Sequence, residues 1–321
     1  MREQYVAVPL LAGAYSSVEA LTLKHETTIG GIECRVLLPG PRPRPDNPVD
    51  APLTPPYDES CQHDPSWPKA DWGYFCAPAA ATIRAIGLVP AGGTIPPGDK
   101  LIAFDEAVTQ WRRLLQDWLS LTAGGPTDFW ESGQGATLWE SPEHENCLAY
   151  GPISSDIKLW DICVSRCLSP SGWLHALTHA GSGDQPPLAR TLLMTAVRAA
   201  LDGNPRVAVI DAATAVEIAL TAGLTETLSA EASPRITKAL IDRTRMLGPR
   251  LDLAKDLGMT LPARMHADLL ERRNTVVHRG ADVTGSHAYA AIDIAWEVVN
   301  KYEALPAHCQ EFYVPRREHR L

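Results

Sequence analysis

The sequence predicts an α+β protein, with a β-rich N-terminal domain over residues 1–183 and an all-α antiparallel helical bundle over residues 184–321. Three observations support this. The chain of 321 residues is 45% hydrophobic and 21% charged, as expected for a globular protein long enough for two domains. The run GSGDQPP, residues 181–187, is typical of a linker. Short apolar runs dominate before this linker, and helical periodicity dominates after it.

The first apolar runs are predicted to be extended. Pro9 and Gly13 interrupt the opening apolar stretch, which favours a strand over a signal peptide. The runs at 20–29 and 32–39 contain β-branched residues and meet at two glycines, so they predict a β-hairpin. Residues 74–90 form a third extended segment, which follows a long proline-rich stretch.

Ten of the 27 prolines lie in that stretch, residues 39–68, which predicts a surface loop because proline cannot donate a backbone hydrogen bond. The loop could contact a partner, or it could be a surface segment without a specific role. After the third extended segment, apolar residues at three- and four-residue spacing from Phe104 to Trp118 predict a helix that ends at Gly124. Residues 127–180 contain short apolar runs, such as residues 156–164, and belong to the β-rich part of the prediction.

Five helices are predicted beyond the linker, each marked by capping or terminating residues. Their short connections favour an antiparallel bundle. They cover residues 188–201, 206–223 after Asn204–Pro205, 235–247 between Ser233–Pro234 and Gly248–Pro249, 261–279 between Thr260 and Gly280, and 287–305 between Ser286 and Pro306.

The net charge of −9 argues against a broad basic surface for duplex DNA. The acidity belongs to the N-terminal part, since residues 188–305 hold 14 basic and 14 acidic residues. The helical part therefore has room for a local basic site. Seven irregularly spaced cysteines suggest a reduced, cytoplasmic protein rather than a disulfide framework. We find no run of about 18 apolar residues and expect no membrane span.

The segment ERRNTVVHRG, residues 271–280, is the most informative of the chain. On an ideal helix Arg273 falls inside an apolar arc, and a guanidinium there needs a carboxylate, a phosphate or a partner subunit. Asn274 and His278 share another face, and Arg273 and His278 are about 140° apart. A joint site therefore requires the long reach of Arg273, distortion of the last turn, or a second copy of the helix. The arc consists of Met265, Leu269, Leu270, Val276 and Val277.

A purely structural interpretation of these residues is available. Glu217 lies in the otherwise mostly apolar run VIDAATAVEIAL and could form an internal ion pair with Arg273. His278 would then be a helix-end residue near the negative end of the helix dipole.

The segment RNTVVHRG, preceded by AVIDAATAVEIAL and followed by an amphipathic helix, resembles the HEPN superfamily, many members of which are metal-independent endoribonucleases of toxin and antiphage systems. The family motif is Arg, four to six residues, then His, usually with a polar residue after the Arg. Arg273, Asn274 and His278 fit it. The resemblance covers about residues 188–305, and a β-rich domain before such a helical domain is similar to defence proteins of the ApeA-like kind.

The resemblance implies an RNA-cleaving effector that acts as a homodimer, with two motifs facing each other across a composite cleft. It implies Arg273, His278 and Asn274 as catalytic residues and Glu217 as a supporting residue. The RNA 2′-OH would be the nucleophile, a His the acid or base, and an Arg the phosphate clamp, without metal or cofactor. Arg272 and Arg279 would hold neighbouring phosphates.

The acidic N-terminal domain would bind a trigger or regulatory partner or recruit substrate. The alternative is a non-catalytic helical module that dimerises or binds a nucleotide. His175 and His179 are four residues apart, but the pattern lacks the Glu of metalloproteases and gives little support for a metal site. Cys163 and Cys167 have no second ligand pair, so buried thiols explain them better.

Overall fold

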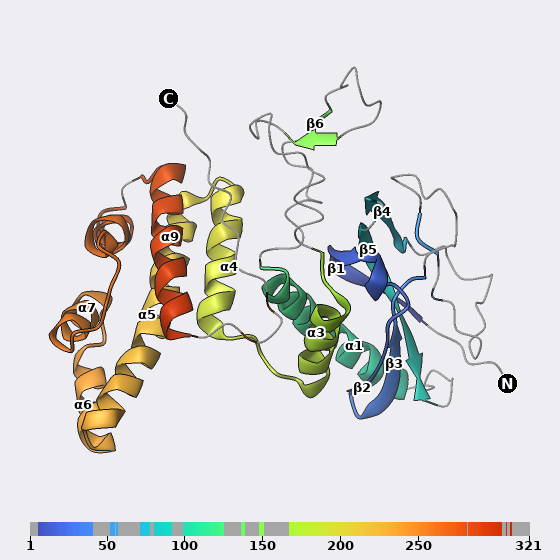
Figure 1. The fold of residues 1–321 in the computed structure, drawn as a ribbon, viewed down its shortest axis with the longest axis horizontal. Coiled ribbons are helices and arrows are strands. Elements are labelled where there is room, and N and C mark those ends of the chain that lie inside the picture. The colour runs from blue at the N-terminus through green and yellow to red at the C-terminus, as the bar shows by residue number, and fades with distance from the viewer. Residues whose placement is uncertain are drawn as a thin grey trace. The chain divides into compact units, whose positions relative to one another are not determined.

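A computed structural model of the chain describes residues 6–40, 52–54, 56, 71–77, 80–91, 99–124, 136–138, 148–150, 167–280, 282–303, 306 and 309. The predicted α+β class is confirmed, because strands fill the first part of the chain and helices the second (Figure 1). Most of the proline-rich segment, the run 156–164 and Cys163 lie outside the described residues.

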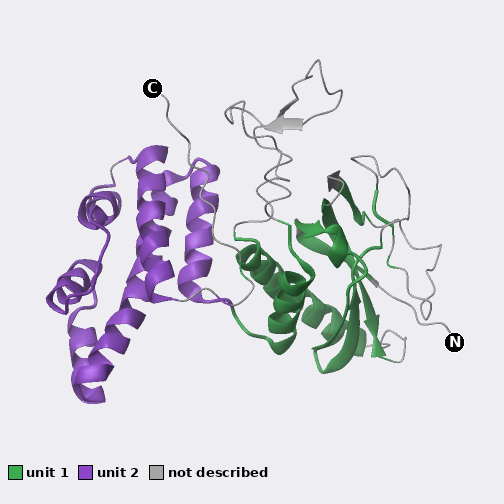
Figure 2. Ribbon diagram, viewed as in Figure 1, with its two compact units in different colours: residues 1–185, 308–311 green, residues 186–307, 312–321 purple. Residues whose placement is uncertain are grey.

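The chain divides into two compact units (Figure 2). One unit contains residues 1–185 and 308–311, and the other contains residues 186–307 and 312–321. The sequence places its boundary after residue 183 and assigns all later residues to the helical domain. The structure instead assigns the short segment 308–311 to the N-terminal unit.

The N-terminal unit is built on a five-stranded antiparallel sheet with β5 at its centre. Along one edge β5 pairs with β1, and along the other it pairs first with β4 and then with β3. The predicted hairpin at Gly30–Gly31 is confirmed as β2 and β3. The strands are β1 (Val6–Ser17), β2 (Lys24–Ile29), β3 (Ile32–Leu37), β4 (Gly73–Ala77) and β5 (Ala80–Pro90), and β6 (Ala136–Leu138) pairs separately with β7 (Leu148–Tyr150).

Helices α1 (Asp99–Thr122) and α3 (Pro170–Ser182) pack on each other, and both contact β2. The second helix extends into the run predicted as a linker. Its Gly181 approaches β2 so closely that a β-carbon there would lie 2.1 Å from Thr27 Oγ1. The linker assignment of Gly181 and Ser182 is therefore wrong, because Gly181 is a packing contact rather than a chain break.

The second unit is helical throughout its described residues. Its long central helix, α5, contacts nearly every other helix of the unit, and α4 and α9 pack beside it (Figure 1). The elements are α4 (Leu188–Leu201), α5 (Pro205–Glu231), α6 (Pro234–Arg243), α7 (Leu247–Asp256), the π-helix η4 (Met265–Leu270), α8 (Glu271–Arg279) and α9 (Gly285–Tyr302).

Several predicted boundaries in this unit are wrong, and α7 is not among the predicted helices. Gly223 does not end α5, because the glycine serves a close contact: a β-carbon there would lie 2.6 Å from Tyr302 Cδ1. Gly248–Pro249 does not close a helix, because the proline occupies the first turn of α7, where a missing N–H is tolerated. The helix predicted from residue 287 begins two residues earlier, at Gly285, because Thr284 rather than Ser286 provides the N-cap, through a capping box with His287.

By length and composition α5 could cross a membrane, unlike the sequence-based expectation of no such segment. Its apolar window is 56% buried within the unit. Small and apolar side chains on several sides of the helix, including Ala208, Val216 and Leu220, are buried against its neighbours. This burial is typical of the core helix of a bundle.

Candidate functional site

The predicted site lies on α8, which continues directly from the π-helix η4. A π-helix turns less per residue than an α-helix, because its hydrogen bonds span five residues. The faces of α8 are therefore rotated relative to the ideal-helix prediction. Met265, Leu269 and Val276 are buried as expected, but Val277 is 46% exposed and does not belong to the apolar arc.

Arg273 lies at the border of the buried face and is half-buried. Its Nη1 donates a hydrogen bond to Asn274 Oδ1 at 3.2 Å. Among the described residues no carboxylate lies within ion-pair distance of Arg273. The sequence predicts a carboxylate, a phosphate or a partner subunit beside a buried Arg273. The structure places this guanidinium at a half-exposed position, and among the described residues its hydrogen-bond partner is Asn274 rather than a carboxylate.

Glu217 does not form the ion pair that the structural interpretation requires. Its Oε1 accepts from Arg250 Nη1 at 2.9 Å, and the two side chains are only 28% and 13% exposed. The pair joins α5 to α7. That interpretation of Arg273 is therefore wrong, and Glu217 supports α8 only through the packing of α5.

Asp211 is the other acid in the same stretch of α5. It accepts a hydrogen bond from Thr195, and burial raises the pKa of its carboxyl group above the usual value. Both acidic residues of the run VIDAATAVEIAL are thus engaged with residues other than Arg273.

His278 and Arg279 occupy the exposed last turn of α8, where positive charge is favoured by the helix dipole. Arg272 is half-buried, and its Nε is enclosed without a hydrogen-bond partner among the described residues. The structure joins Arg273 and Asn274 by a hydrogen bond, whereas His278, five residues after Arg273, is hydrogen-bonded to neither of them.

Arg206 is a cation near the site that the sequence does not indicate. It lies in the first turn of α5 and is exposed, and its Nη2 is 3.7 Å from the position that a β-carbon would take on Gly280. The start of α5 therefore adjoins the end of α8. Arg206, His278 and Arg279 form a small basic cluster, which we call the α8-end cluster. Only the packing of α5 against α8 reveals the cluster, because Arg206 is distant in sequence from His278 and Arg279.

The most deeply buried arginine is Arg190 in α4, which is 2% exposed. Its Nη1 donates to Asn300 Oδ1 at 3.0 Å, and its Nη2 donates to the Glu303 carbonyl. Burial raises the pKa of the Glu303 carboxyl group, and the nearby Arg190 opposes that shift. Arg190 thus joins the start of α4 to the end of α9.

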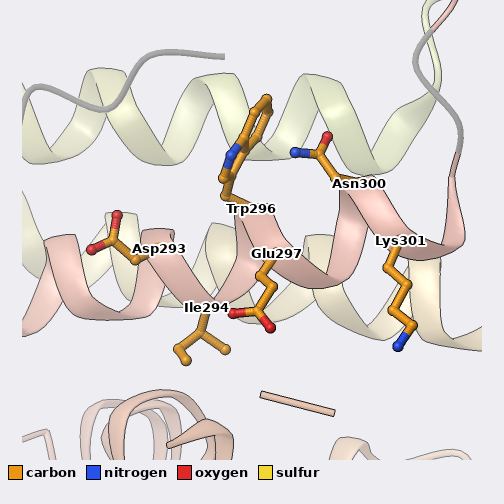
Figure 3. A pocket seen from close by; sticks show the side chains of 6 residues that line it. All are labelled: Asp293, Ile294, Trp296, Glu297, Asn300 and Lys301. Atoms are coloured by element: carbon orange, nitrogen blue, oxygen red, sulfur yellow. The ribbon is translucent and has the colours of Figure 1, made fainter. Parts of the chain in front are cut away.

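An open pocket lies along α9 (Figure 3). Trp296 and Asn300 extend from one side of the helix, and Glu297 and Lys301 extend from the other. None of the residues that line it belongs to the predicted site. Within the part of the chain that the structure describes, no group of three His, Cys, Asp or Glu side chains is arranged to hold a metal ion.

Comparison with known proteins identifies no relative: no family model, no curated protein and no solved structure matches the chain.

Proposed function

We propose that the helical unit is a metal-independent endoribonuclease of the HEPN type, acting as an RNA-cleaving effector of a toxin or antiphage system. One observation carries the proposal. Arg273, five residues before the exposed His278, is half-buried, and among the described residues it has no carboxylate within ion-pair distance and is held only by Asn274. An arginine in this state is available to a phosphate, which it can bind through two parallel hydrogen bonds.

The chemistry uses the nucleophile that RNA itself carries. A base removes the proton of the 2′-OH, the 2′-oxygen forms a bond to phosphorus, and the bond from phosphorus to the 5′-oxygen breaks. An acid gives a proton to that leaving oxygen, so the products are a 2′,3′-cyclic phosphate and a 5′-OH. His278 transfers the protons, and Arg273, oriented by Asn274, stabilises the charge that develops on the phosphate.

The separation of about 140° between Arg273 and His278 on an α-helix argues for two copies of the chain at one site. In this arrangement Arg273 of one copy and His278 of the other approach the same phosphate, as in a two-fold symmetric dimer. The exposure of His278 and Val277 on α8 is consistent with such a contact. Arg206 and Arg279 then bind phosphates on either side of the one that is cut. The acidic N-terminal unit restrains the nuclease until a trigger or regulatory partner binds.

The test is incubation of the full chain with single-stranded RNA in excess EDTA, followed by analysis of the product ends. The proposal predicts cutting with 2′,3′-cyclic phosphate ends and no cutting of DNA of the same sequence, since DNA lacks the 2′-OH. A requirement for added Mg²⁺, or equal cutting of RNA and DNA, would contradict it. RNA binding without any cutting would favour the non-catalytic alternative.

A further inference from the structure

Three rings meet where α1 and α3 pack in the N-terminal unit. Trp118 of α1 stacks on His179 with ring centres 4.3 Å apart, and its edge meets His175 at 5.5 Å. The two imidazoles, one helical turn apart on α3, lie 4.5 Å from each other. The three rings therefore hold one another in fixed orientations.

The far side of this cluster is fixed by hydrogen bonds to one residue. Asp184 Oδ2 lies 2.9 Å from His179 Nδ1, and the Asp184 carbonyl accepts from Trp118 Nε1 at 2.7 Å. His179 is thus anchored by both stacking and a carboxylate. His179 in turn contacts the ring of His175, and that ring also lies beside Cys309.

Cys309 belongs to the short segment, residues 308–311, that forms part of the N-terminal unit although it follows the helical unit in the chain. Its Sγ lies 4.0 Å from His175 Nε2. A thiol beside an imidazole can transfer its proton to the ring, and the resulting thiolate is the reactive form. Cys309 is half-buried, so small molecules in solution can reach it.

Cys34 shows what a purely structural cysteine looks like in the same unit. It is 1% exposed, and burial raises the pKa of its thiol to about 11. Such a thiol is protected from reagents and is protonated at neutral pH. The two cysteines therefore differ in both access and the presence of a neighbouring base.

We propose that Cys309 is a modification site that forms a mixed disulfide with low-molecular-weight disulfides, with His175 as its activating base. The Cys309 thiol gives its proton to His175 Nε2, and the thiolate attacks one sulfur of the incoming disulfide. A new bond joins Cys309 Sγ to that sulfur while the original sulfur–sulfur bond breaks. The departing thiolate takes the proton back from the imidazolium, so the incoming disulfide is the only oxidant required.

This site is independent of the proposed nuclease, since it lies in the other unit. The titratable groups that face the thiol from the packed elements are His175 and His179 of α3, with Asp184 behind His179.

The experiment measures alkylation of the full chain by iodoacetamide at pH 7, with mass spectrometry to follow Cys309 and Cys34 in the same sample. We expect Cys309 to react and Cys34 to stay protected. We expect His175→Gln to slow the alkylation of Cys309 by about tenfold or more, because loss of the neighbouring base leaves a smaller fraction of the thiol as thiolate at pH 7. His25→Gln, a histidine of β2 in the same unit, is the matched control and should leave the rate unchanged.

Protection of Cys34 also reports whether His175→Gln has unfolded the unit, so a lost fold is distinguishable from a lost base. With oxidised glutathione as the probe, the unsubstituted chain should gain one glutathione at Cys309, and a reductant should remove it. Equal alkylation rates for Cys309 in the two His→Gln variants, or no adduct with oxidised glutathione, would overturn the proposal.

Discussion

Two arginines of the helical unit, Arg190 in α4 and Arg273 in α8, have very different surroundings. Arg190 is 2% exposed and donates to Asn300 and to the Glu303 carbonyl, both at the end of α9. Arg273 is half-buried and, among the described residues, donates only to the side chain of its neighbour, Asn274. Arg190 is thus bound by groups from another element, as a structural role requires. Arg273 is instead oriented by its own helix, as the proposed phosphate-binding role requires.

Glu217 and Arg250 strengthen this contrast. The acid that the sequence offered as a partner for Arg273 instead bonds an arginine of α7. The carboxylates of Asp211 and Glu217 are thus engaged without α8, and no described acidic residue forms an ion pair with Arg273. The difference between the two arginines leads to four predictions.

The largest expected effect is on catalysis. Arg273→Ala and His278→Ala should each lower the RNA cleavage rate by about 10²–10⁴, because one removes the phosphate clamp and the other the proton-transfer group. Their urea unfolding midpoints should match that of the unsubstituted chain. Arg245→Ala, which changes another exposed arginine of the same unit, is the control and should cleave normally. Normal cleavage by the Arg273 and His278 variants would refute their assignment.

Arg190→Ala should act on the stability of the helical unit rather than on catalysis. We expect it to lower the free energy of unfolding by about 3–5 kcal/mol, because it leaves a cavity and removes the donors to Asn300 and the Glu303 carbonyl. Urea denaturation followed by circular dichroism measures this loss. A smaller loss of unfolding free energy for Arg190→Ala than for Arg273→Ala would contradict the structural role assigned to Arg190.

Glu217→Gln separates a structural role from a catalytic one. It should lower the free energy of unfolding by about 1–3 kcal/mol, because Arg250 loses its charged partner at a poorly exposed position. The cleavage rate of the folded variant should stay close to that of the unsubstituted chain. A strong catalytic loss with normal stability would restore Glu217 to the active site.

The smallest expected effect belongs to the α8-end cluster. Arg206→Gln is tested in a His278→Ala background, so that RNA binding is measured without cleavage. The substitution should reduce the steepness of log affinity against log salt concentration by the amount expected for the loss of one phosphate contact. Fluorescence anisotropy with labelled single-stranded RNA measures the slope. If Arg206 only stabilises the end of α8, the substitution will lower stability slightly and leave the slope unchanged.

The sequence predicts most of the strands and helices because their hydrophobic periodicity and turn residues are local. The hairpin at Gly30–Gly31 and the helix that contains Trp111 follow from such signals. Gly181 and Gly223 are misleading for the same reason, because a glycine at a close packing contact looks like a chain break when its distant neighbour is unknown. Gly248–Pro249 is misleading because the pair lies in the first turn of a helix rather than after its end.

The candidate site shows a similar division. Arg273, Asn274 and His278 are visible in the sequence because they share one short helix. The π-helix at 265–270 and the exposure of Val277 have no counterpart in the sequence pattern. The burial of Arg190 does have one, because Arg190 precedes Leu193 and Val197 at helical spacing and so lies on the apolar face of its helix. The proximity of Arg206 to Gly280 depends on tertiary packing alone.

The central claim, that Arg273 and His278 from two copies act on one phosphate, is tested most directly by mixing variants. Arg273→Ala and His278→Ala chains with different affinity tags are co-expressed, and the mixed species is purified through both tags. Each pure variant should be inactive, and the mixed species should regain a clear part of the original RNA cleavage rate, because one site then contains an intact arginine and an intact histidine. A mixed species as inactive as its two parents would contradict the account.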